Sequence, residues 1–220
     1  MRLVLFDIDG TLVPGSSSEA RFARYLWDRG ALGLRQLLAF AWFCLRYFPR
    51  YGRHVMQKNK AYLSGRSKAD IAVLARDFVD ERLMPALYAP AVERLRAHQA
   101  AGDRVALLSG TPQFIADALA VALGVEYSHA SLCASKASRY TGAPPVRHPY
   151  GPTKIDAAQA LAKETDLPLA TAVAFGDSIT DAYLFRVVEQ AVAIHHVLVD
   201  AFTEQASCCW CPLAKLGNQH

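Results

Sequence analysis

Residues 3–11 read LVLFDIDGT: an apolar run, then aspartates on alternate residues, then Gly-Thr. A short apolar run bounded by turn residues is typical of a strand buried on both faces of a parallel sheet, and Asp7 and Asp9 stand where that strand should end. Two carboxylates at such a position are costly unless a cation or a reaction uses them. An ordinary Asp-Gly turn is the alternative. The whole pattern instead favours phosphoryl transfer, in which one aspartate attacks phosphorus and the other moves the leaving-group proton.

Residues 104–108, RVALL, predict a second short strand, and Ser109 and Gly110 follow it. A serine hydroxyl and backbone N–H groups at a strand end suit the oxygens of a phosphoryl group. Thr111 and Pro112 are favourable as the N-cap and first residue of a helix, whose positive end would face the same anion. In isolation such a segment is more often a plain turn, but its order after the two aspartates favours the phosphate site.

Charged residues also stand at the ends of later elements. Lys154 follows Gly-Pro-Thr at a predicted helix start, where a lysine is ordinarily a solvated surface charge. Residues 171–175 predict another buried strand, followed by Asp177 at its end and Asp181 in the first turn of a helix. With Asp7 they would form a cluster of hard oxygen ligands, which suits Mg²⁺. A simple helix cap is the alternative for Asp181.

In this order the motifs resemble those of the haloacid dehalogenase-like phosphatases, in the subfamily IB branch that contains phosphoserine phosphatase. The resemblance implies an α/β fold with a Rossmann-like parallel sheet as the core and an inserted α-helical cap. It also implies a Mg²⁺-dependent phosphomonoester hydrolase that acts on a small or amphiphilic phosphorylated metabolite through an aspartyl phosphate. The matching segments are Asp7-Ile8-Asp9-Gly10-Thr11, Ser109-Gly110-Thr111, Gly151-Pro152-Thr153-Lys154 and Gly176-Asp177-Ser178-Ile179-Thr180-Asp181.

The same resemblance implies roles for single residues. Asp7 would be the nucleophile and Asp9 the general acid and base, while Lys154 balances the charge on Asp7 and on the phosphoryl group. Ser109, Gly110 and Lys154 would hold the phosphoryl group. Two other activities stay open: phosphotransfer or mutase chemistry through the same aspartyl phosphate, and phosphate binding without catalysis. The implied metal ligands are Asp7, Asp9, Asp177 and Asp181.

The long stretch between the first two strands reads mostly as helix, and it is the one interruption predicted in the α/β pattern. The catalytic core is therefore predicted at residues 1–14 and 88–220, and a four-helix cap at residues 15–87. In the family that the motifs resemble, an insert at this point selects the substrate. The predicted helices run from a capping box Ser16-x-x-Glu19 to Arg29, over 34–48 up to Pro49, over 54–63, and from a cap at Ser67-x-x-Asp70 to about Met84.

The cap departs from the pattern of phosphoserine phosphatases, which place an acidic residue shortly after the first motif to hold the substrate amino group. Ser16 stands at roughly that position, and Glu19 is already assigned to the capping box. Phosphoserine is therefore disfavoured as the substrate. Cap residues that would either contact the substrate or lie solvated on a helix are Arg50, Arg53, His54 and Lys58.

Residues 37–45, LLAFAWFCL, carry no charge and lie between Arg35 and Arg46. The run is too short to cross a bilayer, so a buried cap helix is the first expectation. Because it is apolar nearly all round, a small cap would struggle to bury it completely. Three further roles stay open: lining a pocket for a lipophilic substrate, peripheral contact with a membrane surface, or a dimer contact.

Composition agrees with a compact enzyme, because the 220 residues are 52% hydrophobic and 20% charged, enough for one core and an inserted module. The net charge of +4 suits a phosphate-bearing ligand, and the sequence predicts no nucleic-acid partner. No secretory signal is recognised, which predicts a cytoplasmic protein with reduced thiols. CCWCPL is interpreted as a buried strand rather than a metal site. The cysteines are Cys44, Cys133, Cys208, Cys209 and Cys211.

Overall fold

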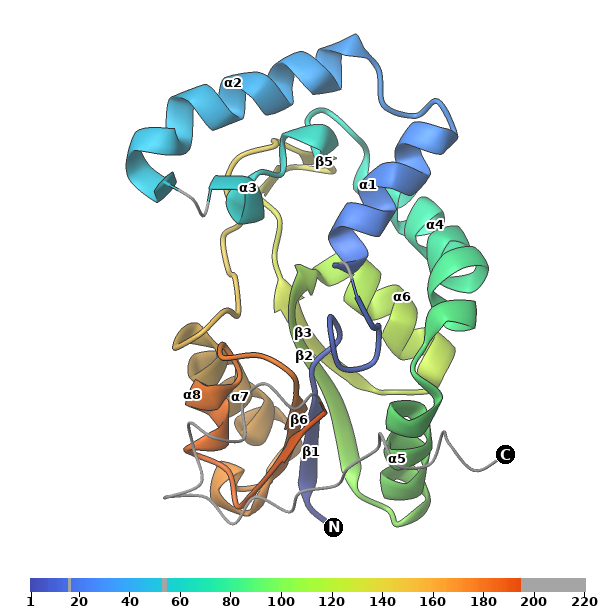
Figure 1. The fold of residues 1–220 in the computed structure, drawn as a ribbon, viewed down its shortest axis with the longest axis vertical. Coiled ribbons are helices and arrows are strands. Elements are labelled where there is room, and N and C mark those ends of the chain that lie inside the picture. The colour runs from blue at the N-terminus through green and yellow to red at the C-terminus, as the bar shows by residue number, and fades with distance from the viewer. Residues whose placement is uncertain (16, 53–54, 195–220) are drawn as a thin grey trace, which may run out of the picture.

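The structure is a computed structural model of the chain and describes residues 1–15, 17–52 and 55–194 (Figure 1). Within these ranges the centre of the fold is a sheet of five parallel strands in the order β3-β2-β1-β6-β7. The apolar run at the start of the sequence forms the central strand, and all of its residues are buried. The strands are β1 (Leu3–Phe6), β2 (Arg104–Pro112), β3 (Tyr127–Ser131), β6 (Val173–Gly176) and β7 (Gln190–Ala193).

Helices cover both faces of the sheet (Figure 1). Val4 and Phe6 of β1 belong to the apolar core that α5 (Ala89–Ala100) and α6 (Gln113–Leu123), on one face, share with the sheet. Leu3 and Leu5 belong to the core on the opposite face, because side chains of a strand alternate. The predicted α/β fold with a Rossmann-like parallel sheet is confirmed. The covering helices are α5 and α6 on one face, and α7 (Thr153–Thr165) and α8 (Ala182–Phe185) on the other.

The segment between β1 and α5 stands above the carboxyl ends of the strands and is largely helical (Figure 1). The chain returns from it at Tyr88, whose backbone N–H donates to the carbonyl of Leu12 (2.9 Å). We keep the name cap for residues 15–87, whose bounds as a domain stay a prediction. Its elements are α1 (Ser18–Asp28), α2 (Leu34–Tyr51), α3 (Val55–Lys58), the 3-10 turn η2 (Ala61–Leu63), α4 (Lys68–Phe78), the π-helical turn η3 (Val79–Leu83) and the 3-10 turn η4 (Met84–Ala86).

The first cap helix begins differently from the prediction. Ser17 is its N-cap, and the Ser17 hydroxyl accepts the backbone N–H of Ala20 (3.2 Å). The predicted role of Glu19 in a capping box is therefore wrong. Ser16, its predicted partner in that box, lies outside the described residues. Three consecutive serines offer the same capping chemistry, so the sequence pattern alone did not distinguish among them.

Two further helix boundaries differ, and one is confirmed. Pro49 does not end α2, because a proline in the last turn removes only one hydrogen bond at an exposed helix end. The helix predicted over 54–63 is instead two short pieces, because the side chain of Asn59 accepts the backbone N–H two residues on (3.0 Å) and so replaces a helical bond. The predicted N-cap of α4 at Ser67 is confirmed, because the Ser67 hydroxyl accepts the backbone N–H of Asp70 (3.5 Å).

The apolar run 37–45 lies within α2, the outermost cap helix in Figure 1. The expectation that it is a buried helix is wrong, because Phe43 is the only residue of α2 that is buried. Helix α2 rests on the rest of the cap through Phe43, which packs with Val55 and Ala61. None of the helices within the described ranges is long and apolar enough to span a membrane.

A second, shorter segment that extends from the core to the cap was not predicted from the sequence. After β3 the chain forms a hairpin of β4 (Ser135–Lys136) and β5 (Arg139–Tyr140) that reaches the cap. There the N–H of Gly65 donates to the carbonyl of Tyr140 (2.8 Å), and the N–H of Tyr140 donates to the carbonyl of Arg66 (3.0 Å). The hairpin therefore joins the core to the cap, although its polar sequence carries no apolar periodicity.

The remaining expectations concern the cysteines and the residues that lie outside the described ranges. Cys44 and Cys133 are free cysteines. The predicted strand CCWCPL, with the other three cysteines, lies outside the described residues, and so do Arg53 and His54.

Candidate active site

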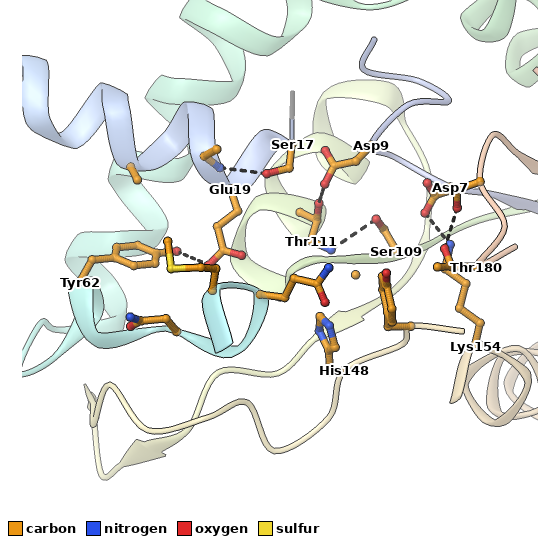
Figure 2. A pocket seen from close by; sticks show the side chains of 18 of the residues that line it. Asp7, Asp9, Ser17, Glu19, Tyr62, Ser109, Thr111, His148, Lys154 and Thr180 are labelled. Atoms are coloured by element: carbon orange, nitrogen blue, oxygen red, sulfur yellow. Dashed lines mark hydrogen bonds and ion pairs between the residues drawn. The ribbon is translucent and has the colours of Figure 1, made fainter. Parts of the chain in front are cut away.

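Polar residues that follow β1 and β6 meet others from the last part of β2 beneath the cap, where they line a cavity of about 620 Å³ (Figure 2). Its other wall comes from α1, α2, α3 and the segment that follows them. Two cap residues predicted as candidate substrate contacts, Arg50 and Lys58, do not line it. The predicted site residues that do line it are Asp7, Asp9, Ser109, Gly110 and Lys154.

Asp7 is buried at the end of β1, and its backbone N–H donates to the carbonyl of Phe175 (3.0 Å), which continues the pairing with β6. Lys154, in the first turn of α7, donates to Oδ1 of Asp7 (2.8 Å) and also contacts Oδ1 of Asp181. Lys154 is only 2% exposed. The alternative of a solvated surface lysine is therefore wrong, and the chain buries this ammonium group between two carboxylates.

The buried charges around Asp7 shift the pKa values of Asp7 and Lys154. Burial raises the pKa of Asp7 to about 7; the attraction of Lys154 opposes that shift and the repulsion of Asp181 adds to it. Burial alone would lower the pKa of Lys154, but the two carboxylates raise it above its ordinary value. One buried lysine does not balance the carboxylates around it, so an additional cation would favour the ionised form of Asp7.

Asp7, Asp177 and Asp181 can each place one oxygen within 4.8 Å of the others. Oδ2 of Asp181 accepts the backbone N–H (3.0 Å) and the hydroxyl (2.7 Å) of Ser178, which fixes the loop after β6. Gly10 adopts φ +88°, and a Cβ added there would lie 1.9 Å from Oδ2 of Asp177. The glycine thus leaves the room that the Asp177 carboxylate needs beside the nucleophile candidate. Three hard oxygen donors in this arrangement fit Mg²⁺.

The Asp9 carboxylate has other partners. Its Oδ1 accepts the backbone N–H of Ser18 (2.7 Å), and its Oδ2 accepts the hydroxyl of Thr111 (2.7 Å). Ser18 is the first residue of α1, so the positive end of a cap helix faces this carboxylate. The prediction that Thr111 is a helix N-cap is wrong, because β2 continues through Pro112 and α6 begins at Gln113. Thr111 instead orients Asp9, a role that only the folded sheet reveals.

Ser109 and Gly110 line the cavity as expected, but they lie within β2 and not after it, because the strand continues to Pro112. The Ser109 hydroxyl accepts the backbone N–H of Thr111 (3.3 Å), and the carbonyl of Gly110 accepts the hydroxyl of Ser131 (2.6 Å). Both residues are thereby held with their polar groups beside the cavity that Asp7 faces. Their binding of a phosphoryl group stays a prediction.

His148 is a cavity residue that sequence reasoning missed (Figure 2). Because the single proton of the Ser131 hydroxyl goes to Gly110, the serine oxygen accepts from Nδ1 of His148 (2.5 Å), and Nε2 then carries a lone pair. Burial, together with the nearby lysines, lowers the pKa of His148 to about 3, so the ring is a neutral acceptor. It lies in an aperiodic segment, so no sequence pattern pointed to it.

Glu19 also faces the cavity, contrary to its predicted capping role (Figure 2). Its Oε1 accepts from the ammonium group of Lys60 (2.6 Å) and from the hydroxyl of Tyr62 (3.0 Å). Lys60 is 1% exposed and does not line the cavity. The carboxylate nearest to the substrate space in the cap is therefore neutralised from within the chain.

The rest of the cap wall combines apolar side chains with the uncharged polar side chains of Ser17, Gln57, Asn59 and Tyr62. From the apolar run 37–45 only Phe40 lines the cavity, whereas Trp42 is 64% exposed and Phe43 packs inside the cap. The run thus contributes a single side chain to the cavity. The apolar lining residues of the cap are Ala20, Ala23, Phe40 and Met56.

An aspartate after the central strand of a parallel sheet, paired with a buried lysine and covered by a helical insert, defines a capped α/β enzyme that acts on anionic groups. The sequence model of the haloacid dehalogenase-like hydrolases matches residues 4–186, and the chain belongs to this family. The resemblance drawn from the motifs is confirmed at the level of the family.

Curated relatives are similar over most of this chain. A putative hydrolase of Mycobacterium leprae is 29% identical over 197 residues, which cover 86% of this chain and 65% of the relative. The phosphoserine phosphatase SerB1 of Mycobacterium tuberculosis is also 29% identical over 197 residues and is covered to 63%. The chain thus spans less than two thirds of the length of these relatives.

Solved structures share the fold. A protein of unknown function from Bordetella pertussis has a TM-score of 0.73 at 26% identity, with 87% of this chain and 89% of that chain covered. A phospho-aspartyl intermediate analogue of phosphoserine phosphatase has a TM-score of 0.56 at 19% identity, with 87% and 85% covered. At that identity the second likeness supports the fold alone.

Proposed function

We propose that the chain is a Mg²⁺-dependent phosphomonoester hydrolase that forms an aspartyl phosphate on Asp7. The observation that carries this proposal is the buried pair of Asp7 and Lys154 at the cavity. A carboxylate nucleophile must face the substrate while a positive charge offsets the charge of the incoming phosphoryl group. A relative named phosphoserine phosphatase, with a hydrolase among the others, supports the reaction type.

The proposed reaction has two halves. In the first, a carboxylate oxygen of Asp7 attacks phosphorus, the bond from phosphorus to the leaving-group oxygen breaks, and Asp9 gives that oxygen a proton. In the second, Asp9 takes a proton from a water molecule, whose oxygen attacks the same phosphorus and releases phosphate from Asp7. The hydrogen bonds from Ser18 and Thr111 hold the Asp9 carboxylate in one orientation for both transfers. Ser109 and Lys154 would hold the phosphoryl oxygens.

Asp7, Asp177 and Asp181 would hold the Mg²⁺ ion. When bound, the ion supplies positive charge against the repulsion between these carboxylates and the phosphoryl group. The Asp9 carboxylate, predicted from the sequence as a fourth ligand, is not proposed as one, because it is not among the described carboxylates whose oxygens lie within 4.8 Å of one another.

Release of inorganic phosphate by the purified chain from a panel of phosphomonoesters, with Mg²⁺ and no acceptor alcohol, tests this function. We expect turnover in water alone. Phosphate release that requires an added alcohol would indicate a phosphotransferase or mutase instead. Binding of phosphate without any turnover across the panel would indicate a protein that only binds phosphate.

The leaving group is proposed to be uncharged or apolar next to the ester oxygen. Glu19 is the cap carboxylate that would attract a substrate ammonium group, but Lys60 already neutralises it. Around it, Phe40 and Met56 offer apolar surface, which stabilises an aliphatic leaving group by about 0.8 kcal/mol for each methylene buried. Phosphoserine, named for a relative, is the competing substrate and belongs in the panel.

Lys60→Gln is expected to change this preference. With its internal partner removed, Glu19 would pair with an amine on the substrate, and a charge-assisted hydrogen bond of this kind corresponds to about tenfold or more in affinity. We therefore expect kcat/KM for phosphoethanolamine, relative to ethyl phosphate, to rise by about tenfold.

The double variant Lys60→Gln with Glu19→Gln is the control and should lose the gain, because the wall is again uncharged. If the unmodified chain already prefers phosphoethanolamine or phosphoserine to ethyl phosphate, the proposed leaving group is wrong. Circular dichroism of each variant separates a loss of fold from a change of preference.

A further inference from the structure

The outer face of α2 is a continuous apolar stripe. Side chains spaced three or four residues apart share one face of a helix, and here such positions hold large apolar residues from the first turn to the last. The most exposed are Leu45 at 72% and Leu34 at 71%. Isolated exposed apolar residues are ordinary, but a stripe along a whole helix is not. Its members are Leu34, Leu37, Leu38, Trp42, Leu45 and Phe48.

Arginines border this stripe along one side. Arg35, Arg46 and Arg50 are exposed and, at helical spacing, fall between the apolar stripe and the face that packs on the cap. No ion pair involves any of them among the described residues, and α2 contains no acidic residue. Long arginine side chains can keep their charge at a polar boundary while the neighbouring apolar residues enter a less polar phase.

We propose that the outer face of α2 rests on an anionic lipid surface. A helix with a wide apolar stripe, a border of arginines and no acids has the composition of helices that lie in the plane of a membrane interface. Anionic headgroups complement these arginines, of which Arg46 and Arg50 lie over the rings of Tyr47 and Tyr51 and meet no carboxylate among the described residues. A second copy of this chain fits less well, because two such helices packed face to face would bring their arginines together without a carboxylate on either.

The position of α2 determines how the cavity would lie relative to the lipid surface. The face opposite the stripe carries Phe40, which lines the cavity, so the same helix separates the lipid surface from the substrate space. In Figure 1 α2 is the outermost element at the cap end, away from both faces of the sheet. Docking through α2 would therefore hold the cavity close to the headgroup layer. The inference does not depend on the proposed catalytic activity.

Co-sedimentation with lipid vesicles tests the proposal. We expect the full chain to bind phosphatidylcholine vesicles that contain roughly one third phosphatidylglycerol, and to bind pure phosphatidylcholine at least about tenfold more weakly. Neutralising Arg46 and Arg50 to Gln should weaken binding by about fivefold for each arginine, and high salt should remove the difference. Leu38→Ser with Leu45→Ser should abolish binding, because it interrupts the apolar stripe.

Val121→Ser is the matched control, because Val121 is 78% exposed on α6 and far from the stripe in sequence and element. It should bind as the unmodified chain does. Trp42 should show a blue-shifted emission on anionic vesicles when Trp27 and Trp210 are replaced by Phe. Equal failure to bind both vesicle types overturns the proposal. So does a dimer, seen by analytical ultracentrifugation, that Leu38→Ser with Leu45→Ser dissociates, because α2 would then be an interface between copies.

Discussion

Asp7→Asn is expected to lower turnover by at least about 10⁴-fold while leaving the fold intact. The amide keeps the shape of the side chain but lacks the charge needed to attack phosphorus. Lys154 retains Asp181 as a partner, so its burial does not become unfavourable. Steady-state phosphate release and thermal unfolding, measured on the same preparation, check both halves of the expectation.

Asp156→Asn is the matched control, because Asp156 is exposed on α7 and does not line the cavity. It should retain nearly full turnover. Mass spectrometry must exclude deamidation of the new asparagine, which would restore the nucleophile. Substantial turnover by an intact Asp7→Asn protein would show that another group attacks phosphorus.

Removal of divalent cations is expected to abolish turnover, and added Mg²⁺ to restore it. Without a cation, the carboxylates of Asp7, Asp177 and Asp181 repel one another, and burial keeps the pKa of Asp7 near 7, so the nucleophile is partly protonated. Binding of Mg²⁺ should also raise the unfolding temperature, since an ion that binds only the folded state stabilises it. Calcium should stabilise the protein as well but support little turnover, because its coordination is larger and less regular.

The variant Asp177→Asn tests whether the loss of activity on chelation comes from loss of a metal ion at this site. It should weaken the Mg²⁺-dependent rise in unfolding temperature, a measurement that does not require turnover. Undiminished activity after exhaustive chelation would exclude the proposed role of the ion. An Asp177→Asn variant with unchanged response to Mg²⁺ would place the ion elsewhere.

The parts of the fold that could be predicted are those that local pattern determines. The apolar run before Asp7 indicated a buried strand, and the polar residues at the ends of the later predicted strands indicated the edge where Ser109 and Asp177 gather. The close approach of Gly10 to Asp177 could not be predicted in this way, because the two residues are far apart in sequence. Order along the chain was enough to assemble these segments because parallel strands end at a common edge.

The parts that could not be predicted depend on partners distant in sequence. Glu19 meets Lys60 across a gap of 41 residues, and neither residue carries a local sign that it would be buried. Thr111 orients Asp9 only because β2 lies beside β1. The exposure of α2 was foreseen only as one of several open roles of the run 37–45, because an apolar sequence indicates burial on average.

The pairing of β1 has a consequence for how the protein is made. The strand β1, which precedes Asp7, is synthesised before both of its neighbours in the sheet, which begin at Arg104 and Val173. Each of its edges therefore waits for a segment that leaves the ribosome much later, and parallel pairing over such separations is slow. Until then an apolar strand has both edges free, which is a hazard for association with other chains. The stretch that carries the proposed chemistry is thus also the one that most needs protection during synthesis.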